Sequence, residues 1–200
     1  MKNLFHRAAA AAFGLAISAS ASWAGSSLYG DEGVIIVPAA VSSSTDVDAS
    51  AIIPDVSRGQ VVAYDTQKPR GSILVSTRKN ELYFVLGHGQ AIKYRVATAK
   101  KGFEWAGTHK VSRKAVWPSW SPPAEMRARR PDLPAFMAGG PKNPLGARAI
   151  YLGSSIYRIH GTNEPKSIGK AASSGCIRML NDDVAELYRL VRPGAEVTVY

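Results

Sequence analysis

Two apolar, aromatic segments on either side of a glycine-rich turn restrict the fold of this chain more than any other part of the sequence. They read ELYFVL and AIKYRVAT, and GHGQ joins them across residues 87–90. Aromatic and β-branched residues favour extended backbone, and the glycines beside His88 allow the sharp reversal of a hairpin. We therefore expect a β-hairpin in this region, with His88 at the tip of its turn.

Further short segments share this composition and predict additional strands. In one of them, SIYRIHG, strand alternation places Arg158 and His160 on the face opposite Tyr157 and Ile159. The segments GSILVST, THKVSRKAVWP, ARAIYLG, SIYRIHG and AEVTVY all contain β-branched or aromatic residues.

One helix is expected after them, in NDDVAELYRLVRPG. Asn181 has the character of an N-cap, and Val184, Leu187 and Val191 recur at helical spacing until Pro193 stops the helix. The fold is therefore predicted to be mainly β, with β-sandwich-like mixed sheets and this single helix.

The N-terminus has the layout of a secretory signal peptide. Lys2 and Arg7 precede an apolar, alanine-rich run, and the residues SWA provide a cleavage position after Ala24. The run is too poor in strongly apolar residues for a membrane span, which takes roughly 20 of them. The alternative is a buried alanine-rich helix. We expect residues 1–24 to be removed and the mature chain to be exported to the periplasm or cell envelope.

Two segments have the composition of linkers or loops. Residues 25–70 show no persistent helical or strand periodicity, which predicts a low-order extension. The alternative is that GVIIVPAA docks as an edge strand that Pro38 ends. Residues 117–144 hold seven prolines and two tryptophans. Because so many large side chains would be costly to expose, we expect this segment to fold over a cleft as a lid-like loop. Its arginines, Arg127, Arg129 and Arg130, either meet substrate carboxylates or keep the loop soluble.

The surplus of basic residues bears on the partner. The formal net charge is +10, which in an exported chain suits an acidic substrate or a polyanionic envelope surface better than nucleic acid. The alternative is a solvated basic face without a partner.

Cys176 is the only cysteine of the chain. In an oxidising compartment it is either bonded to another chain or a free, reactive thiol, unless it is simply buried and inert. Three neighbours favour reactivity: His160 ends a strand, Gly175 permits unusual backbone angles, and Arg178 can lower the thiol pKa or hold a carboxylate. A cysteine and a histidine suffice as nucleophile and base. A metal site is disfavoured because no third ligand lies nearby.

The ordered motif around these residues resembles the L,D-transpeptidase catalytic domain, the YkuD family. It consists of His-Gly-Thr at 160–162 and Ser-Ser-Gly-Cys-Ile-Arg-Met at 173–179. Upstream, LYFVLGHGQAIKYRVATAKKGFEWAGTHKV and NPLGARAIYLGSSIYRIHGTNEPKSIG are also similar to the family, so the resemblance covers roughly 72–200. One departure is Ser174, where the family commonly has histidine.

The resemblance implies a YkuD-like fold, a catalytic domain at 71–200 and a reaction without metal or cofactor. Cys176 would attack a peptidoglycan stem peptide, release the terminal D-Ala and pass the acyl group to an amine of a second stem or an envelope protein. His160 would be the base, oriented by the carbonyl of Gly161. The N–H groups of Gly175 and Cys176 would bind the oxyanion, and the other candidate substrate-binding residues are Arg178, Ser174, Ser173, Trp117 and Trp120.

Other functions remain open at this stage. A non-catalytic peptidoglycan-binding module would need only the fold and the basic surface, and an L,D-carboxypeptidase would use water as the acceptor. A sortase-like enzyme spreads its His, Cys and Arg more widely, and a papain-like protease places its cysteine before its histidine, so both fit the residue order poorly.

Overall fold

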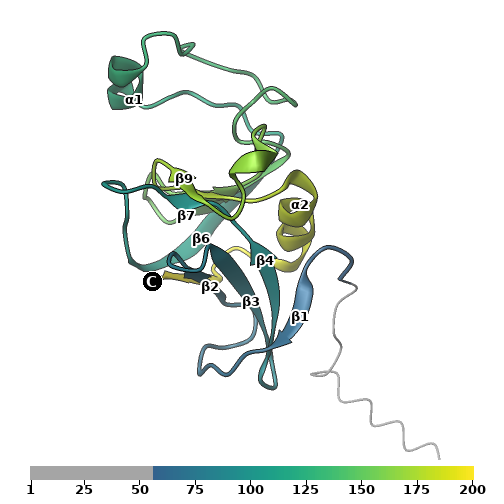
Figure 1. Ribbon diagram of the computed structural model, residues 1–200. Helices are drawn as coiled ribbons and strands as arrows, with labels where there is room; N and C mark the ends of the chain where they lie inside the picture. The colour runs from purple at the N-terminus through teal and green to yellow at the C-terminus, as the bar shows by residue number, and fades with distance from the viewer. Residues whose placement is uncertain (1–55) are drawn as a thin grey trace, which may run out of the picture. The chain divides into compact units, whose positions relative to one another are not determined.

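The computed structural model describes residues 56–200, which form two sheets and few helices (Figure 1). The predicted signal peptide and residues 25–55 of the predicted extension lie outside the described residues. No helix in the described part of the chain has the length and apolar character needed to cross a membrane.

Most strands belong to one mixed sheet. They are β1 (Gln60–Ala63), β2 (Ile73–Ser76), β3 (Glu81–Gly87), β4 (Gln90–Arg95), β6 (Gly107–Val116), β7 (Arg148–Leu152), β8 (Arg158–His160), β10 (Ile177–Arg178) and β11 (Glu196–Val199). Their order is β1-β4-β3-β2-β11-β6-β7-β8-β10. Neighbours are antiparallel except for two parallel pairs, β2 with β11 and β8 with β10. Two further strands, β5 (Thr98–Ala99) and β9 (Ala171–Ser173), form a small parallel sheet. The prediction of a mainly β fold with mixed sheets is confirmed.

The predicted hairpin is formed by β3 and β4. Phe84 pairs with Ile92 across it, and the turn holds Gly87, His88 and Gly89 at φ values of +83°, +50° and +69°. Such angles cost glycine little, which explains the two glycines of the turn. His88 lies at the tip, as expected.

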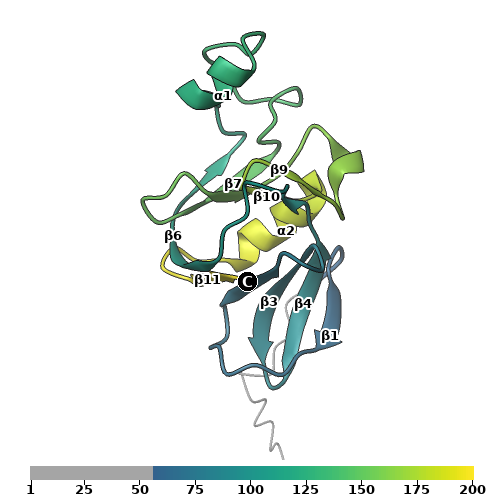
Figure 2. The same cartoon turned by 60° about the vertical axis from the view of Figure 1, so that its left-hand side comes forward.

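Both faces of this hairpin are covered, which explains its nearly continuous apolar sequence. On one face, Ile73, Leu82 and Ile92 join a large core with Ile150, Leu187 and other residues of β7 and the C-terminal helix. On the other face, a smaller cluster holds Leu74, Tyr83, Val85 and Ala91, packed against Val62 and Tyr64. Figure 2 shows the hairpin and β1 at one end of the described chain and the helix α1 (Ala124–Arg129) at the other.

The predicted C-terminal helix is α2 (Asn181–Leu190), which packs on β7 and β8. Val184 and Leu187 are fully buried, as their spacing predicts. The N-cap prediction was wrong: Leu180 is the N-cap, and Asn181 is the first helical residue. The Asn181 amide does not serve its own helix because it bonds the backbone of two other segments.

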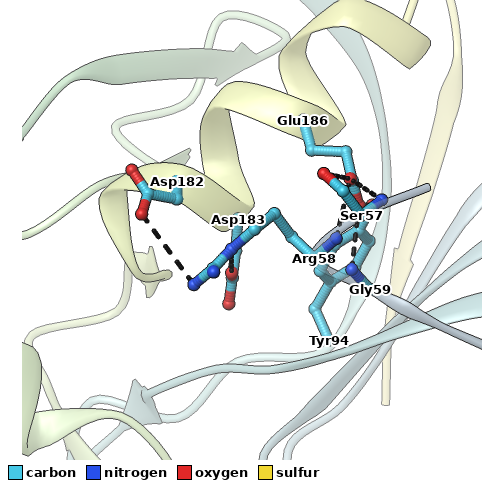
Figure 3. A network of polar contacts seen from close by, with 7 residues as sticks. All are labelled: Ser57, Arg58, Gly59, Tyr94, Asp182, Asp183 and Glu186. Carbon is cyan, nitrogen blue, oxygen red and sulfur yellow. Dashed lines mark hydrogen bonds and ion pairs between the residues drawn. The ribbon is translucent and has the colours of Figure 1, made fainter. Parts of the chain in front are cut away.

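Residues 56–70 carry more structure than the predicted low-order extension. They contain β1, which pairs with β4 at the edge of the sheet, and a turn that sits on α2. There the carboxylate of Glu186 accepts three successive backbone N–H groups, those of Ser57, Arg58 and Gly59, at 2.8–2.9 Å (Figure 3). The Tyr94 hydroxyl donates to the same carboxylate at 2.8 Å.

The segment 117–144 is a long excursion between β6 and β7. It contains α1 and a bridge between Trp120 and Met137. Asn143, near the end of this segment, is buried, and its side-chain amide donates to the carbonyls of Pro118, Met137 and Ala138 at 3.0–3.2 Å. One asparagine therefore ties both arms of the excursion together. The other short helix, η2 (Pro165–Ser167), follows β8.

Candidate active site

The paired strands β8 and β10 bring the predicted histidine and cysteine to one cavity. Arg178 pairs with His160 in parallel register, so their side chains lie on one face of the sheet, and Cys176 lies directly before β10. His160, Cys176, Arg158 and Arg178 line a cavity of ≈ 680 Å³. Residues far apart in the sequence thus meet because two short strands are adjacent.

His160 is held in one tautomer and in its neutral form. Its side chain is almost fully buried, and its Nδ1 donates to the carbonyl of Gly161 at 2.6 Å. This bond places the proton on Nδ1 and leaves Nε2 as an acceptor. Burial lowers the pKa of His160 to about 3, and the positive charge of Arg178 acts in the same direction. The imidazole is therefore neutral at physiological pH.

Asn181 fixes the loop that presents this histidine. Its Oδ1 accepts the N–H groups of Ala147 and Thr162 at 3.0 and 3.1 Å, and its Nδ2 donates to the Thr162 carbonyl at 3.0 Å. A Cβ on Gly161 would lie 2.2 Å from this Oδ1, so the position requires glycine. The sequence pointed to Asn181 as a cap and missed this role.

The turn before Cys176 is held by side chains from three segments. Trp105 Nε1 donates to the carbonyl of Gly175 at 2.7 Å, and the Trp105 indole stacks on Tyr157 at a centroid distance of 4.1 Å. Gly175 has a φ of +111°, and a Cβ there would lie 2.8 Å from the Tyr157 ring. Glycine is therefore required both by its backbone angle and by the ring against it. Trp105 and Tyr157 were not among the predicted site residues, although aromatic residues near the motif were a possible signal.

The Ser173 hydroxyl makes two hydrogen bonds within the same turn. Its hydroxyl donates to the Cys176 carbonyl at 2.5 Å and accepts the Gly175 N–H at 3.2 Å. The Gly175 N–H, one of the two expected oxyanion donors, is thus already engaged with a side chain in this structure. Ser174 lines the cavity.

The thiol of Cys176 is half-buried and has no disulfide partner in the described part of the chain. Its Sγ lies 3.9 Å from the carbonyl oxygen of Ile156. Burial raises the pKa of the thiol, while the nearby charges of Arg158 and Arg178 oppose that rise. The guanidinium of Arg178 is paired with Glu164 at 2.8 Å.

The excursion 117–144 supplies one wall of the cavity. Trp120 lines it together with Arg129 and Arg130, whereas Trp117 and Arg127 do not. The Trp117 side chain is instead 41% exposed. The charged lining is strongly basic: it consists of Lys100, Arg129, Arg130, Lys142, Arg158 and Arg178, with Glu164 as the acidic residue. Among residues 56–200, no group of three His, Cys, Asp or Glu side chains is placed to hold a metal ion.

Several known proteins with similar sequences are described as L,D-transpeptidases. The sequence model of the L,D-transpeptidase catalytic domain, YkuD, matches residues 70–199. The chain is 35% identical over 146 residues to "Probable L,D-transpeptidase YbiS" of Escherichia coli (strain K12), which covers 69% of this chain and 46% of that relative. It is 36% identical over 149 residues to "Probable L,D-transpeptidase ErfK/SrfK" of the same strain, covering 70% of this chain and 46% of the relative.

A solved structure shows the same fold. The catalytic domain of the E. faecium L,D-transpeptidase has a TM-score of 0.52 and 17% sequence identity, and the match covers 68% of this chain and 100% of that chain. This likeness confirms the predicted fold. The chain spans about half the length of the curated relatives named above.

Proposed function

The chain belongs to the L,D-transpeptidase catalytic domain family, YkuD, and from this membership we propose that it is a cysteine-dependent L,D-transpeptidase acting on peptidoglycan stem peptides. The observation that carries the proposal is the His160 ring, whose Nδ1 is bonded to the Gly161 carbonyl inside a cavity that Cys176 also lines. A neutral imidazole fixed in this way is suited to accept a thiol proton.

The proposed reaction has two halves. In the first, the Cys176 thiol proton passes to Nε2 of His160, and the thiolate attacks the carbonyl of the third stem residue. The tetrahedral intermediate collapses to a thioester, and the leaving amine of the terminal D-Ala takes the proton from His160. In the second, an acceptor amine attacks the thioester, loses a proton to His160, and releases the thiol. The Cys176 N–H is the proposed oxyanion donor.

The positive charge of the cavity lining favours a negatively charged stem peptide as the acyl donor. A stem peptide carries carboxylates, including that of its terminal D-Ala, and the cavity lining holds six cations against one carboxylate. Arg178, which pairs with His160 across the two strands and lines the cavity, is a proposed substrate contact. Export to the cell envelope, through the predicted signal peptide at 1–24, would bring the enzyme to this substrate.

Purified muropeptides and the mature protein provide the direct test. We expect mass spectrometry to show an acyl adduct on Cys176 and free D-Ala, and both should be lost in Cys176→Ala. If neither product forms with the unmodified protein, the transpeptidase proposal fails. Retained binding to isolated peptidoglycan without any reaction would favour the non-catalytic module.

The acceptor can be tested in the same experiment. With an added stem peptide that bears a free amine, a cross-linked product is expected at the expense of the hydrolysed one. If hydrolysis alone continues at saturating amine, the enzyme is an L,D-carboxypeptidase instead. Intact-mass detection of a carbapenem adduct on Cys176, which the family resemblance implies, would provide an independent check of the nucleophile.

A further inference from the structure

Arg158 lies beside the thiol on the strand that carries His160. The Ile156 carbonyl oxygen is 3.0 Å from Arg158 Nη2 and 3.9 Å from Cys176 Sγ. The guanidinium and the thiol therefore both contact the same carbonyl oxygen. Arg158 Nε is buried and has no hydrogen-bond partner within the described residues. A buried N–H without an acceptor is costly, so this donor calls for an acceptor that forms in another state of the site.

The surrounding charges leave Arg158 as the uncompensated cation nearest the thiol. On β10, Arg178 faces the same cavity but is paired with Glu164. On β8, Arg158 contacts no carboxylate within residues 56–200 and lies over the Tyr151 ring at 5.4 Å. His160 supplies no positive charge because its imidazole stays neutral before the reaction.

The remaining cations of the cavity do not contact the thiol through a shared acceptor. Arg130 is paired with Asp132 at 2.6 Å. Lys100 and Arg129 lie over the Phe103 ring at 5.2 and 5.4 Å, and Lys142 also lines the cavity. None of these four shares a hydrogen-bond acceptor with Cys176 in the described contacts, as Arg158 does.

We propose that the guanidinium of Arg158 stabilises the thiolate of Cys176. When the thiol proton leaves to His160, the sulfur becomes a full acceptor and gains a positive partner, which compensates for its burial. This inference rests on Cys176 as the nucleophile of the proposed function. It adds a second group to the motif: the base removes the proton, and Arg158 makes the resulting anion stable.

The pH profile of Cys176 alkylation tests this role without requiring transpeptidase activity. The chain has one cysteine, so iodoacetamide labelling of the full protein, followed by intact mass, reports this thiol alone. An opposite charge at such range shifts a pKa by about one unit or more. We therefore expect Arg158→Gln to move the midpoint of the profile upward by about one pH unit, a tenfold change in thiolate equilibrium.

Two features separate a charge effect from a structural one. In Arg158→Gln the rate at the alkaline plateau should stay level or rise slightly, because a more basic thiolate is more nucleophilic. Arg158→Lys keeps the positive charge, so its midpoint should lie close to that of the unmodified protein. Arg113→Gln is the matched control, since Arg113 also stacks on Tyr151, at 3.4 Å, but does not line the cavity.

Each outcome bears on the inference. An unchanged midpoint in Arg158→Gln overturns it, as does a shift that Arg158→Lys does not reduce or that Arg113→Gln reproduces. Circular dichroism confirms folding, and Arg158→Met, which keeps an apolar stem, replaces Arg158→Gln if that variant unfolds. If the unmodified protein forms no acyl adduct with muropeptides, the proposed function fails; if it does but the midpoints coincide, only the role of Arg158 fails.

Discussion

Single residues outside the motif fix the backbone beside the proposed nucleophile and the proposed base. Trp105 bonds the Gly175 carbonyl and stacks on Tyr157, while Asn181 bonds the backbone of Ala147 and of Thr162, the residue after Gly161. Neither residue has a proposed role in the chemical steps. Each fixes the backbone from which the thiol or the imidazole projects. Small displacements of such groups are expensive in catalysis.

Trp105→Phe should separate positioning from stability. The phenyl ring can still stack on Tyr157, but the N–H donor to Gly175 is lost. We expect the rate of Cys176 acylation to fall roughly tenfold, with a loss of about 1 kcal/mol in unfolding free energy. Single-turnover acylation and urea unfolding measure the two effects. Trp117→Phe, at an exposed position outside the cavity, is the control; an equal loss there would contradict the assignment.

Asn181→Ala should destabilise the protein more strongly. It leaves the N–H groups of Ala147 and Thr162 without their acceptor, and Thr162 is buried. We expect a loss of about 2–3 kcal/mol in unfolding free energy, measured by denaturant titration. The exposed Asn163, which donates to the Lys142 carbonyl, offers the comparison: Asn163→Ala should change stability little. Similar values for the two variants would refute the role of Asn181.

At this scale the sequence indicated the proposed reactive residues but not the residues that hold them in place. His160, Cys176 and Arg178 stand in an ordered motif that can be read directly. Asn181 carries the ordinary signature of a helix cap, and only the tertiary structure shows its oxygen turned toward β7 and the His160 loop. Trp117 and Trp120 look equivalent in sequence, but the backbone of the excursion brings only Trp120 to the cavity.

Among the elements, α2 does more than fill the core. Burial alone would raise the pKa of Glu186, but the N–H groups of Gly59, Ser57 and Arg58 and the Tyr94 hydroxyl lower it below its ordinary value. A carboxylate whose pKa is depressed by folding contributes stability that is present above its unfolded pKa and is lost as pH falls through the folded value. The attachment of residues 57–59 to α2 is therefore acid-sensitive.

Glu186→Gln tests this attachment. Near neutral pH the variant should lose about 2 kcal/mol, since an amide oxygen replaces a carboxylate among several donors. The stability difference between the two proteins should shrink as pH falls below about 4. Denaturant unfolding of both proteins across pH measures this difference. A difference that is constant with pH would contradict an ionised Glu186.

The elements themselves were largely predictable. Apolar runs, turn glycines and helical spacing indicated β2, β3, β4, β6, β7, β8, α2 and β11. Strand β1 was not predicted because its residues, QVVA, lie in a polar stretch. Its position at the sheet edge depends on pairing with β4 and on the Glu186 contacts, which the sequence pattern does not show. The helix α1 was hidden by the surrounding prolines, and no cap or buried face marks it.

For the molecule as a whole, the basic cavity predicts a salt dependence. The carboxylates of the donor peptide and the cations of the cavity attract each other, and added salt screens this attraction. We expect kcat/KM for a donor with free carboxylates to fall several-fold between about 0.05 and about 0.5 M salt. A donor whose side-chain carboxylates are amidated should change less. Steady-state assays with both donors measure this, and parallel salt curves would show that the cavity charge does not act on those carboxylates.

The two tasks of α2 also predict how the folded protein opens. Five backbone amides from distant parts of the chain donate to its side chains: those of Ser57, Arg58 and Gly59 to Glu186, and those of Ala147 and Thr162 to Asn181. If α2 unravels, all five lose their acceptors together, so they form one cooperative unit for hydrogen exchange. The first described turn of the chain and the loop behind the proposed base should therefore exchange with the same opening free energy, although more than 80 positions separate Gly59 from Ala147.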